Sequence, residues 1–410
     1  MKILFFTQVL PYPLNAGPKV RAYYVLRHLA QKHEITLVSF VRSTDTPAAI
    51  AHLATFCHAV HTVPMPRSPL RDGYHLLRSL LSQQPFLIAR DWNGAMVHKI
   101  NELLHAVETG TVTPFDAIHA DQLWMSPYAL LAQRQQQRKR AHTVLDQHNA
   151  VFMIPERLAG DDANLPKRLL LQWEARKMAR YEVAVCQRFD HVVWVTQEDY
   201  QAVQQQAARL GQSVPCAAII PICGDSTEQP AIQRQPTAHR ITFVGGLHYP
   251  PNAQGICWFA ETVFPQVLAQ APQSVLTVIG KQPPLALQKL GIPPQNLEIT
   301  GFVDRVEPYL AETAAFVAPL LAGGGMRVKI IDGWRWGMPV VSTTIGAEGI
   351  AIQPEENILI ADTPATFAER TLQLLQQPQK AKQLAMAGRQ WFEAHYDWQQ
   401  VYRQWDRIYL

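Results

Sequence analysis

The sequence GGGMRVKIID, residues 323–332, joins the apolar segment 314–321 to the second apolar run GMPVVS, residues 337–342. A buried strand therefore ends in three glycines that open a helix. Glycines let backbone N–H groups approach an anion closely, and a helix N-terminus adds a positive dipole to the charges of Arg327 and Lys329. The pattern predicts a diphosphate cradle, with Asp332 one turn further on, where ribose hydroxyls could lie. The alternative is a surface helix in which Lys329 and Asp332 form an i,i+3 ion pair.

Length and composition are those of a globular enzyme with two domains. The 410 residues are too many for one ordinary core and fit two domains of about 200 residues. A net charge of +4 does not by itself indicate a nucleic-acid partner, and we expect none. Five cysteines without metal-type spacing indicate reduced thiols. No apolar run reaches the roughly 20 residues of a spanning helix, so we expect a cytoplasmic protein with at most peripheral contact at the inner face of a membrane.

Short apolar runs alternate with longer amphipathic stretches, which is typical of parallel strands joined by crossover helices. In the first half we expect strands near residues 2–7, 34–40, 117–121, 143–147, 191–196 and 217–221. The second half repeats the scheme near residues 240–244, 274–279, 297–300, 314–319, 339–343 and 358–361. Residues 224–239 are polar and lack either periodicity, which predicts a linker.

Residues 329–350, KIIDGWRWGMPVVSTTIGAEGI, closely resemble the donor-binding segment of family-four glycosyltransferases, which have the GT-B fold. Residues 243–252 resemble the first strand and loop of that family's C-terminal domain, and residues 301–310 resemble its base-contacting turn. Residues 2–6 and 17–21 resemble the N-terminal strand and glycine loop of the same family. The resemblance implies an α/β protein of two doubly wound, Rossmann-like domains that face an interdomain cleft.

This resemblance also implies the domain boundaries. Residues 1–224 are expected to form the acceptor-binding domain and residues 225–393 the nucleotide-sugar-binding domain. The tail, about residues 394–410, is expected to pack back on the first domain. Neither domain opens with G-x-G-x-x-G, and no P-loop motif is present, so dehydrogenase and P-loop NTPase functions fit poorly.

On the donor side, the resemblance extends the cradle. The expected donor and diphosphate-binding residues are Gly17, Gly245, Gly246, Val303, Gly324, Gly325, Met326, Arg327, Lys329 and Asp332. The family usually carries two glutamates separated by seven residues, and here Gly324 and Asp332 stand in their places. Asp332 keeps the charge on a side chain shorter by one methylene. At Gly324 the carboxylate is lost, so either backbone N–H groups take over the sugar contacts or transfer is impaired.

Two strand ends in the first half carry candidate catalytic residues. The sequence IHADQ, residues 118–122, places His119 and Asp121 where the family often has His-x-His. The next strand ends in DQHN, residues 146–149, and brings His148 to the same edge. A neutral imidazole near pH 7 could orient an acceptor hydroxyl or bind the donor sugar. Each of these residues has a structural alternative, as a hydrogen-bonded buried side chain.

A predicted helix in the first half combines leucines with arginines. Leucines at 76, 77, 80 and 81 are flanked by Arg67, Arg71, Arg78 and Arg90. Such a helix either lies on an anionic membrane or packs its leucines inward, and we favour inward packing.

The sequence therefore predicts an enzyme of polysaccharide biosynthesis that moves a hexose-type sugar from a nucleoside-diphosphate-sugar to a hydroxyl acceptor. The acceptor is a glycan, a lipid-linked molecule or a small molecule. The resemblance implies retention of configuration, and charge on the departing diphosphate would be stabilised by Arg327 and Lys329. No cofactor or metal is expected beyond the donor substrate. Two alternatives stay open: a catalytically silent nucleotide-sugar-binding subunit and a GT-B sugar-nucleotide epimerase.

Overall fold

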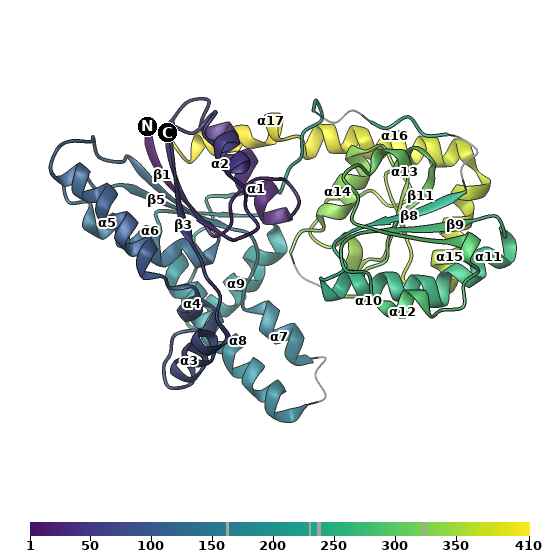
Figure 1. Cartoon of the computed structure of the whole chain (residues 1–410), viewed down its shortest axis with the longest axis horizontal. Coiled ribbons are helices and arrows are strands. Elements are labelled where there is room, and N and C mark those ends of the chain that lie inside the picture. The colour runs from purple at the N-terminus through teal and green to yellow at the C-terminus, as the bar shows by residue number, and fades with distance from the viewer. Residues whose placement is uncertain (161–163, 229–230, 236–238, 323–324) are drawn as a thin grey trace. The chain divides into compact units, whose positions relative to one another are not determined.

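The chain folds into two compact units, each built around its own parallel sheet. The computed structural model describes residues 1–160, 164–228, 231–235, 239–322 and 325–410 (Figure 1). Unit 1 comprises Met1–Ile222 and Val401–Leu410, and unit 2 comprises Cys223–Gln400. The expected α/β class with two doubly wound sheets is confirmed.

Unit 1 contains a seven-stranded sheet in the order β3-β2-β1-β4-β5-β6-β7. Its strands are β1 (Lys2–Thr7), β2 (Glu34–Val41), β3 (Ala59–Pro64), β4 (Ala117–Asp121), β5 (His142–Gln147), β6 (His191–Trp194) and β7 (Ala218–Ile219). The strand order reverses between β1 and β4, and ligands of such sheets bind beyond the carboxyl ends of the strands at this point. The register pairs Phe5 with His119 and Asp121 with Asp146, which brings these residues to that edge.

Helices connect the strands of unit 1 and enclose a continuous apolar core. They are α1 (Gly17–Leu29), α2 (Pro47–Leu53), α3 (Pro69–Leu80), α4 (Phe86–Asp91), α5 (Gly94–Glu108), the 3-10 turn η1 (Leu123–Met125), α6 (Ser126–Gln135), α7 (Met153–Gly160), α8 (Leu165–Cys186) and α9 (Gln197–Arg209). The strands are nearly all apolar because helices bury them, as the sequence pattern predicts.

Unit 2 repeats this plan with six parallel strands in the order β10-β9-β8-β11-β12-β13. The strands are β8 (Arg240–Val244), β9 (Val275–Ile279), β10 (Leu297–Gly301), β11 (Thr313–Ala318), β12 (Val340–Ser342) and β13 (Leu359–Ile360). The helices are α10 (Pro250–Trp258), the π-helical turn η2 (Phe259–Val263), α11 (Phe264–Gln270), α12 (Leu285–Gln288), η3 (Pro294–Asn296), α13 (Glu307–Ala311), α14 (Val328–Arg335), η4 (Ile345–Ala347), α15 (Pro364–Gln376) and α16 (Pro378–His395). In Figure 1, α14 and α16 cover one face of this sheet and α10 and α11 the other.

The last part of the chain is helical with one interruption. After α16 the helical conformation is interrupted at Tyr396 and Asp397. The helix α17 (Trp398–Val401) and the 3-10 helix η5 (Tyr402–Arg407) follow. Residues 401–410 belong to unit 1, where Tyr402, Trp405 and Tyr409 are buried. Within the described ranges, no helix has the length and apolar character needed to cross a bilayer.

Two features differ from the sequence-based expectations. Strand β3 was not predicted, because AVHTVP at the edge of the sheet is only half-buried and alternates weakly. The predicted inward packing of the leucines of α3 is wrong, since Leu76, Leu77, Leu80 and Leu81 are all exposed. The buried side chains of this helix are instead those of His75 and Ser79.

Candidate functional site

A buried chain of charges lies at the carboxyl edge of the unit 1 sheet. Arg21, from α1, donates from Nε and Nη2 to the two carboxylate oxygens of Asp146 at 2.9 and 2.8 Å, and both side chains are fully buried. Its Nη1 also donates to the backbone carbonyl groups of Ile220 and Pro221. The charge of Asp146 is thus held by a bidentate pair, the strongest geometry for such a contact.

His148 extends this chain to Asp121. Its Nε2 donates to Oδ1 of Asp121 at 2.9 Å and lies 3.6 Å from Oδ2 of Asp146. Burial opposes a charge on His148, but Asp121 and Asp146 outweigh it and raise the pKa of the imidazole to about 9. Burial also raises the pKa of Asp121, whereas for Asp146 the contacts to Arg21 and His148 overcome burial and lower the pKa. The raised pKa favours the protonated imidazole of His148 at neutral pH.

His119, one strand away, has the opposite character. Burial lowers the pKa of His119 to about 3, so its imidazole is neutral at pH 7. The ring stacks on Phe5 at a centroid distance of 3.9 Å, and its Nδ1 lies 2.5 Å from the hydroxyl of Tyr409. The ring of Trp405 also contacts the imidazole of His119, at a centroid distance of 5.6 Å. A neutral, rigidly held imidazole has the properties of an acceptor or donor of a hydrogen bond to a sugar hydroxyl.

Several polar atoms at this edge have no hydrogen-bond partner among the described residues. They are Oγ1 of Thr7, Nε2 of His119, Oδ2 of Asp121, Nε2 of Gln122 and Nδ1 of His148. Buried polar atoms normally require a partner, so such a cluster fits a site for a polar ligand. Gln122 also has a φ of 71°, a strained conformation of the kind found at ligand sites.

The same edge offers three ligand atoms to a cation. Side-chain atoms of His119, Asp121 and Asp146 lie within 4.8 Å of one another. Both oxygens of Asp146 already accept hydrogen bonds from Arg21, and His148 neutralises Asp121. Two protonated neighbours therefore already balance the two carboxylates of this cluster.

Glu182, on α8, fixes the loop that carries His148. Its carboxyl group accepts hydrogen bonds from the backbone N–H groups of Val151 at 2.9 Å and Phe152 at 3.1 Å, and from the side chain of Gln147. Burial raises the pKa of Glu182 to about 8. This buried residue positions the site without reaching its unpartnered atoms.

In unit 2, Lys329 lies at the carboxyl end of β8. Its Nζ, on the first turn of α14, donates to the carbonyl of Val244 and lies 4.1 Å from the ring centre of Phe243. Burial lowers the pKa of Lys329 to about 7. The turn at Gly245 leaves room for the ammonium group, because a methyl group there would overlap Nζ. A cation at this position, beside a helix N-terminus, fits an anionic ligand.

Arg327 and Asp332 are held by other partners. Nη2 of Arg327 pairs with Glu348 at 3.1 Å, and its Nε donates to the carbonyl of Ile345 at 3.1 Å. Asp332 forms its i,i+3 ion pair with Arg335 at 2.9 Å, so the alternative pair with Lys329 is not the one that holds it. Burial raises the pKa of Asp332.

The other predicted donor residues lie in turns or at helix ends. Gly17 begins α1, Gly246 accepts a hydrogen bond from Asn252 at 2.9 Å, and Val303 lies in the loop after β10. Gly325 has a φ of 71°, which favours glycine, and Met326 is buried. Gly324 lies outside the described residues.

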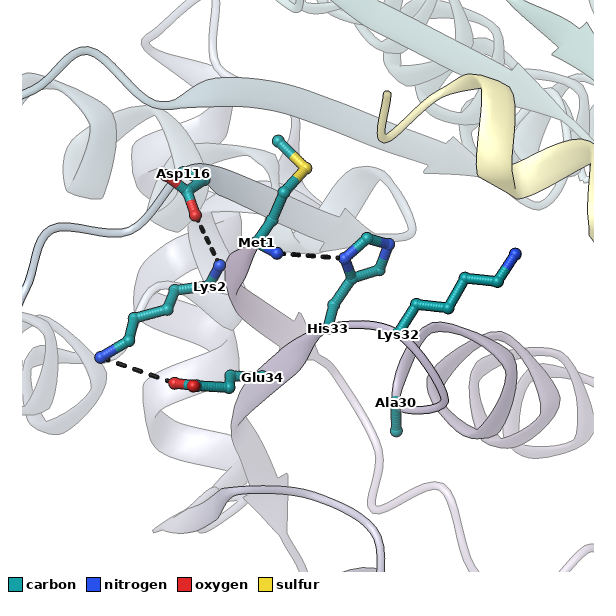
Figure 2. Close-up of a pocket in the computed structure, with 7 residues that line it drawn as sticks. All are labelled: Met1, Lys2, Ala30, Lys32, His33, Glu34 and Asp116. Carbon is teal, nitrogen blue, oxygen red and sulfur yellow. Dashed lines mark hydrogen bonds and ion pairs between the residues drawn. The ribbon is translucent and has the colours of Figure 1, made fainter.

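A surface hollow of about 440 Å³ lies at the opposite, amino-terminal edge of the unit 1 sheet. Figure 2 shows its polar lining, in which the amine of Met1 contacts His33 at 3.2 Å and Asp116 accepts from the backbone N–H of Lys2 at 2.6 Å. Lys2 also pairs with Glu34 at 3.5 Å. These groups satisfy one another, and none belongs to the carboxyl-edge site.

A segment of the second unit matches a known family. Residues 238–377, which include β8, α14 and β12, match the model of the family described as glycosyl transferases group 1. An uncharacterized 44.6 kDa protein in the cps region of Klebsiella pneumoniae is 27% identical over 175 residues. This match spans 40% of the chain and 44% of that relative. The predicted resemblance to this class of glycosyltransferases is confirmed for the matched segment.

Solved structures show the fold of the whole chain to be GT-B. The structure of HepE from Anabaena with UDP and glucose aligns with a TM-score of 0.67 and 14% identity over 100% of this chain and 99% of that one. Sucrose-phosphate synthase from Thermosynechococcus elongatus gives 0.65 and 16%, covering 100% and 98%. WaaG, a glycosyltransferase involved in lipopolysaccharide biosynthesis, gives 0.64 and 13%, covering 99% of both chains. The predicted GT-B fold is thus confirmed.

Sequence reasoning gave no site role to Arg21, Glu182 or Tyr409, although each is buried and hydrogen-bonded in the unit 1 site. Asp146 was expected at the strand end that reaches this edge, two residues before His148, but its pairing with Arg21 was not expected.

Proposed function

We propose that the protein transfers a sugar from a nucleoside-diphosphate-sugar to a hydroxyl acceptor. The observation that carries this proposal is the position of Lys329, at the N-terminus of α14 and the carboxyl end of β8, within the segment that matches glycosyl transferases group 1. As the glycosidic bond breaks, negative charge builds on the diphosphate. Lys329, Arg327 and the helix N-terminus stabilise this leaving group.

The neutral imidazole of His119 is proposed to orient a sugar or acceptor hydroxyl through Nε2. Asp121 and His148 are a second pair of ligand-facing groups at the same edge, because each retains one unpartnered buried atom there. Retention of configuration is the stereochemical course we propose, by resemblance to family four. We propose no metal requirement, because Arg21 and His148 already neutralise the carboxylates of Asp146 and Asp121.

The donor and acceptor classes follow from the relatives. HepE was solved with UDP-glucose, so UDP-hexoses are the first donors to test. WaaG is described as acting in lipopolysaccharide biosynthesis, which makes glycans and lipid-linked sugars the first acceptors. We also propose a cytoplasmic location for the protein, because its proposed donor, a nucleotide sugar, is a cytoplasmic substrate.

The test is a thermal-shift screen of nucleotide sugars followed by mass spectrometry of products, with NMR of the new anomeric proton to establish the configuration. We expect one donor class to stabilise the protein and to yield a product that retains the donor's anomeric configuration. Lys329→Gln should lose the thermal shift with that donor. If wild type and Lys329→Gln bind the donor equally, the cradle assignment is wrong.

A catalytically silent nucleotide-sugar-binding subunit is the second candidate, favoured by glycine in place of the usual glutamate at Gly324. It predicts donor binding without hydrolysis or transfer on any acceptor. The two candidates differ only in turnover, so product analysis separates them.

A further inference from the structure

The helix α3 presents its apolar side to solvent. Leu70, Tyr74, Leu77 and Leu81 are 87, 61, 65 and 92% exposed. Their spacing of four, three and four residues places Leu70, Tyr74 and Leu77 on one stripe along the helix, and Leu81, its C-cap residue, continues this stripe. Amphipathic surface helices normally bury their apolar stripe. In α3 the apolar stripe faces solvent and the polar side faces the protein.

Polar contacts hold α3 in this orientation. Nζ of Lys177, a buried residue of α8, lies 2.6 Å from Oγ of Ser79 and donates to its carbonyl at 2.9 Å. His75, also buried, receives a long contact from Arg71, whose Nη2 donates to the carbonyl of Trp92 at 2.9 Å. Because Ser79 and His75 lie on the side of the helix opposite the leucine stripe, the helix is anchored by its polar side and the stripe stays outward.

Basic side chains flank the stripe. Arg71 and Arg78 each follow a stripe residue by one position, and Arg67 precedes the helix; all three are exposed. Asp72 is the one acidic residue between positions 67 and 81, so this segment carries three positive charges against one negative charge, although Arg67 also pairs with Asp91 at 2.8 Å. This combination of exposed leucine and tyrosine side chains with neighbouring arginines is typical of helices that lie at the surface of an anionic bilayer.

Neighbouring elements add apolar surface at the same end of unit 1. The exposed side chains Ile154 and Leu158 on α7 and Leu165 and Leu169 on α8 lie in helices that project on the same side of unit 1 as α3, below the sheet in the view of Figure 1. Trp92, also exposed, adds an aromatic ring of the kind enriched at bilayer interfaces.

We propose that α3 is a membrane-docking helix that inserts the stripe of Leu70, Tyr74, Leu77 and Leu81 into the surface of an anionic lipid bilayer. The exposed Arg78 then faces the lipid phosphates, and Arg67 and Arg71 add positive charge beside it, each with part of its guanidinium group already bound to Asp91 or to the carbonyl of Trp92. The occupant is the bilayer rather than a protein partner, because the stripe is bordered by positive charge that anionic headgroups complement. This docking is independent of the proposed sugar transfer, since it uses none of the donor or acceptor residues.

The experiment is co-sedimentation of the full chain with vesicles of phosphatidylcholine alone and of phosphatidylcholine mixed with phosphatidylglycerol, at low and high salt. Three variants are compared with wild type: Leu77→Gln with Leu81→Gln, Arg71→Gln with Arg78→Gln, and the control Leu285→Gln, which replaces a similarly exposed leucine of α12 in unit 2. Glutamine keeps the helix propensity close to that of leucine and arginine.

We expect wild type to bind anionic vesicles and to lose binding with salt, because the Debye length shrinks. The double leucine variant should bind at least about tenfold more weakly, since each buried leucine contributes strongly to partitioning. The arginine variant should lose the preference for anionic lipid, and Leu285→Gln should match wild type.

Two results would overturn the proposal. One is absence of vesicle binding by wild type, or binding that the leucine variant retains in full. The other is a concentration-dependent dimer that Leu77→Gln with Leu81→Gln dissociates while no vesicle binding occurs, which would assign the stripe to a second copy of this chain. The vesicles contain no sugar acceptor and the binding assays contain no donor. A failure of membrane binding can therefore be told apart from a failure of sugar transfer.

Discussion

The hydroxyl of Tyr409 lies 2.5 Å from Nδ1 of His119, although 290 residues separate the two in sequence. Tyr409 is in the C-terminal segment that packs on unit 1, and Trp405 of the same segment covers the imidazole. The segment therefore fixes the orientation of the ring and leaves Nε2 as the atom that can meet a ligand.

Replacing Tyr409 with Phe should lower turnover more than donor affinity. The variant removes one hydrogen bond and keeps the packing, so His119 can rotate out of its productive orientation. Misplaced reacting groups typically cost on the order of 10- to 100-fold in rate. Steady-state kinetics and calorimetry with the donor measure the two effects, and Tyr200→Phe, at a half-buried tyrosine of α9, is the control. Equal losses of turnover and donor affinity would indicate a merely structural role for Tyr409.

Breaking the buried pair of Arg21 and Asp146 should destabilise the protein strongly. Asp146→Asn leaves the guanidinium uncompensated in the interior, and loss of one partner of such a pair costs about 3 to 5 kcal/mol of the free energy of unfolding. Replacing both residues, as Arg21→Met with Asp146→Leu, should cost clearly less than the sum of the two single variants. Urea denaturation followed by tryptophan fluorescence gives these values, and strict additivity would contradict the coupling.

Nucleoside-diphosphate binding should be coupled to proton uptake at Lys329. Burial holds the pKa of the free lysine at about 7, and a bound diphosphate raises it. Protonated Lys329 is already present below pH 7, so affinity should be greatest there and should fall as pH rises through 7 toward the pKa of the complex.

Calorimetry in buffers of different ionisation enthalpy at pH 8 should show uptake approaching one proton per UDP bound. Lys329→Gln should abolish that uptake and flatten the pH dependence. A wild-type affinity that is constant from pH 6 to about 9 would show that Lys329 does not meet the diphosphate.

Gly245→Ala should weaken diphosphate binding without unfolding unit 2. The added methyl group overlaps Nζ of Lys329 and lies 3.1 Å from Nδ2 of Asn252, so the lysine must move away from β8. Loss of one charge-assisted contact corresponds to about 1.5 to 3 kcal/mol of binding free energy. Gly94→Ala is the matched control, because a methyl group there has nothing within 4 Å. Unchanged UDP affinity in Gly245→Ala, measured by calorimetry, would argue against a strict steric requirement.

The fold could be predicted because its signals are local. The apolar pattern of each strand and the turn residues that follow it lie within about ten residues of sequence. The repeated alternation of strands and helices then predicts a doubly wound arrangement. The edge strand β3 escaped because it is half-exposed and carries no continuous apolar run.

The site could be predicted only in part, because its support is non-local. His119, Asp121 and His148 stood out at strand ends, but Arg21 reaches Asp146 across 125 residues and no spacing rule links them. The orientation of α3 was mispredicted for a similar reason, since the buried Lys177 that anchors its polar side comes from α8. Leucine content alone cannot tell which face of a helix meets the protein.

The most direct test compares wild type and His119→Ala for product formation and donor binding, with the donor that the nucleotide-sugar screen identifies. We predict that wild type transfers the sugar to a hydroxyl acceptor, and that His119→Ala loses roughly 10²- to 10⁴-fold in rate while its donor affinity changes little. The contrary result is a wild-type protein that binds the donor yet neither hydrolyses nor transfers it on any acceptor. If Gly324→Glu then gained turnover, the chain would be a silent nucleotide-sugar-binding protein.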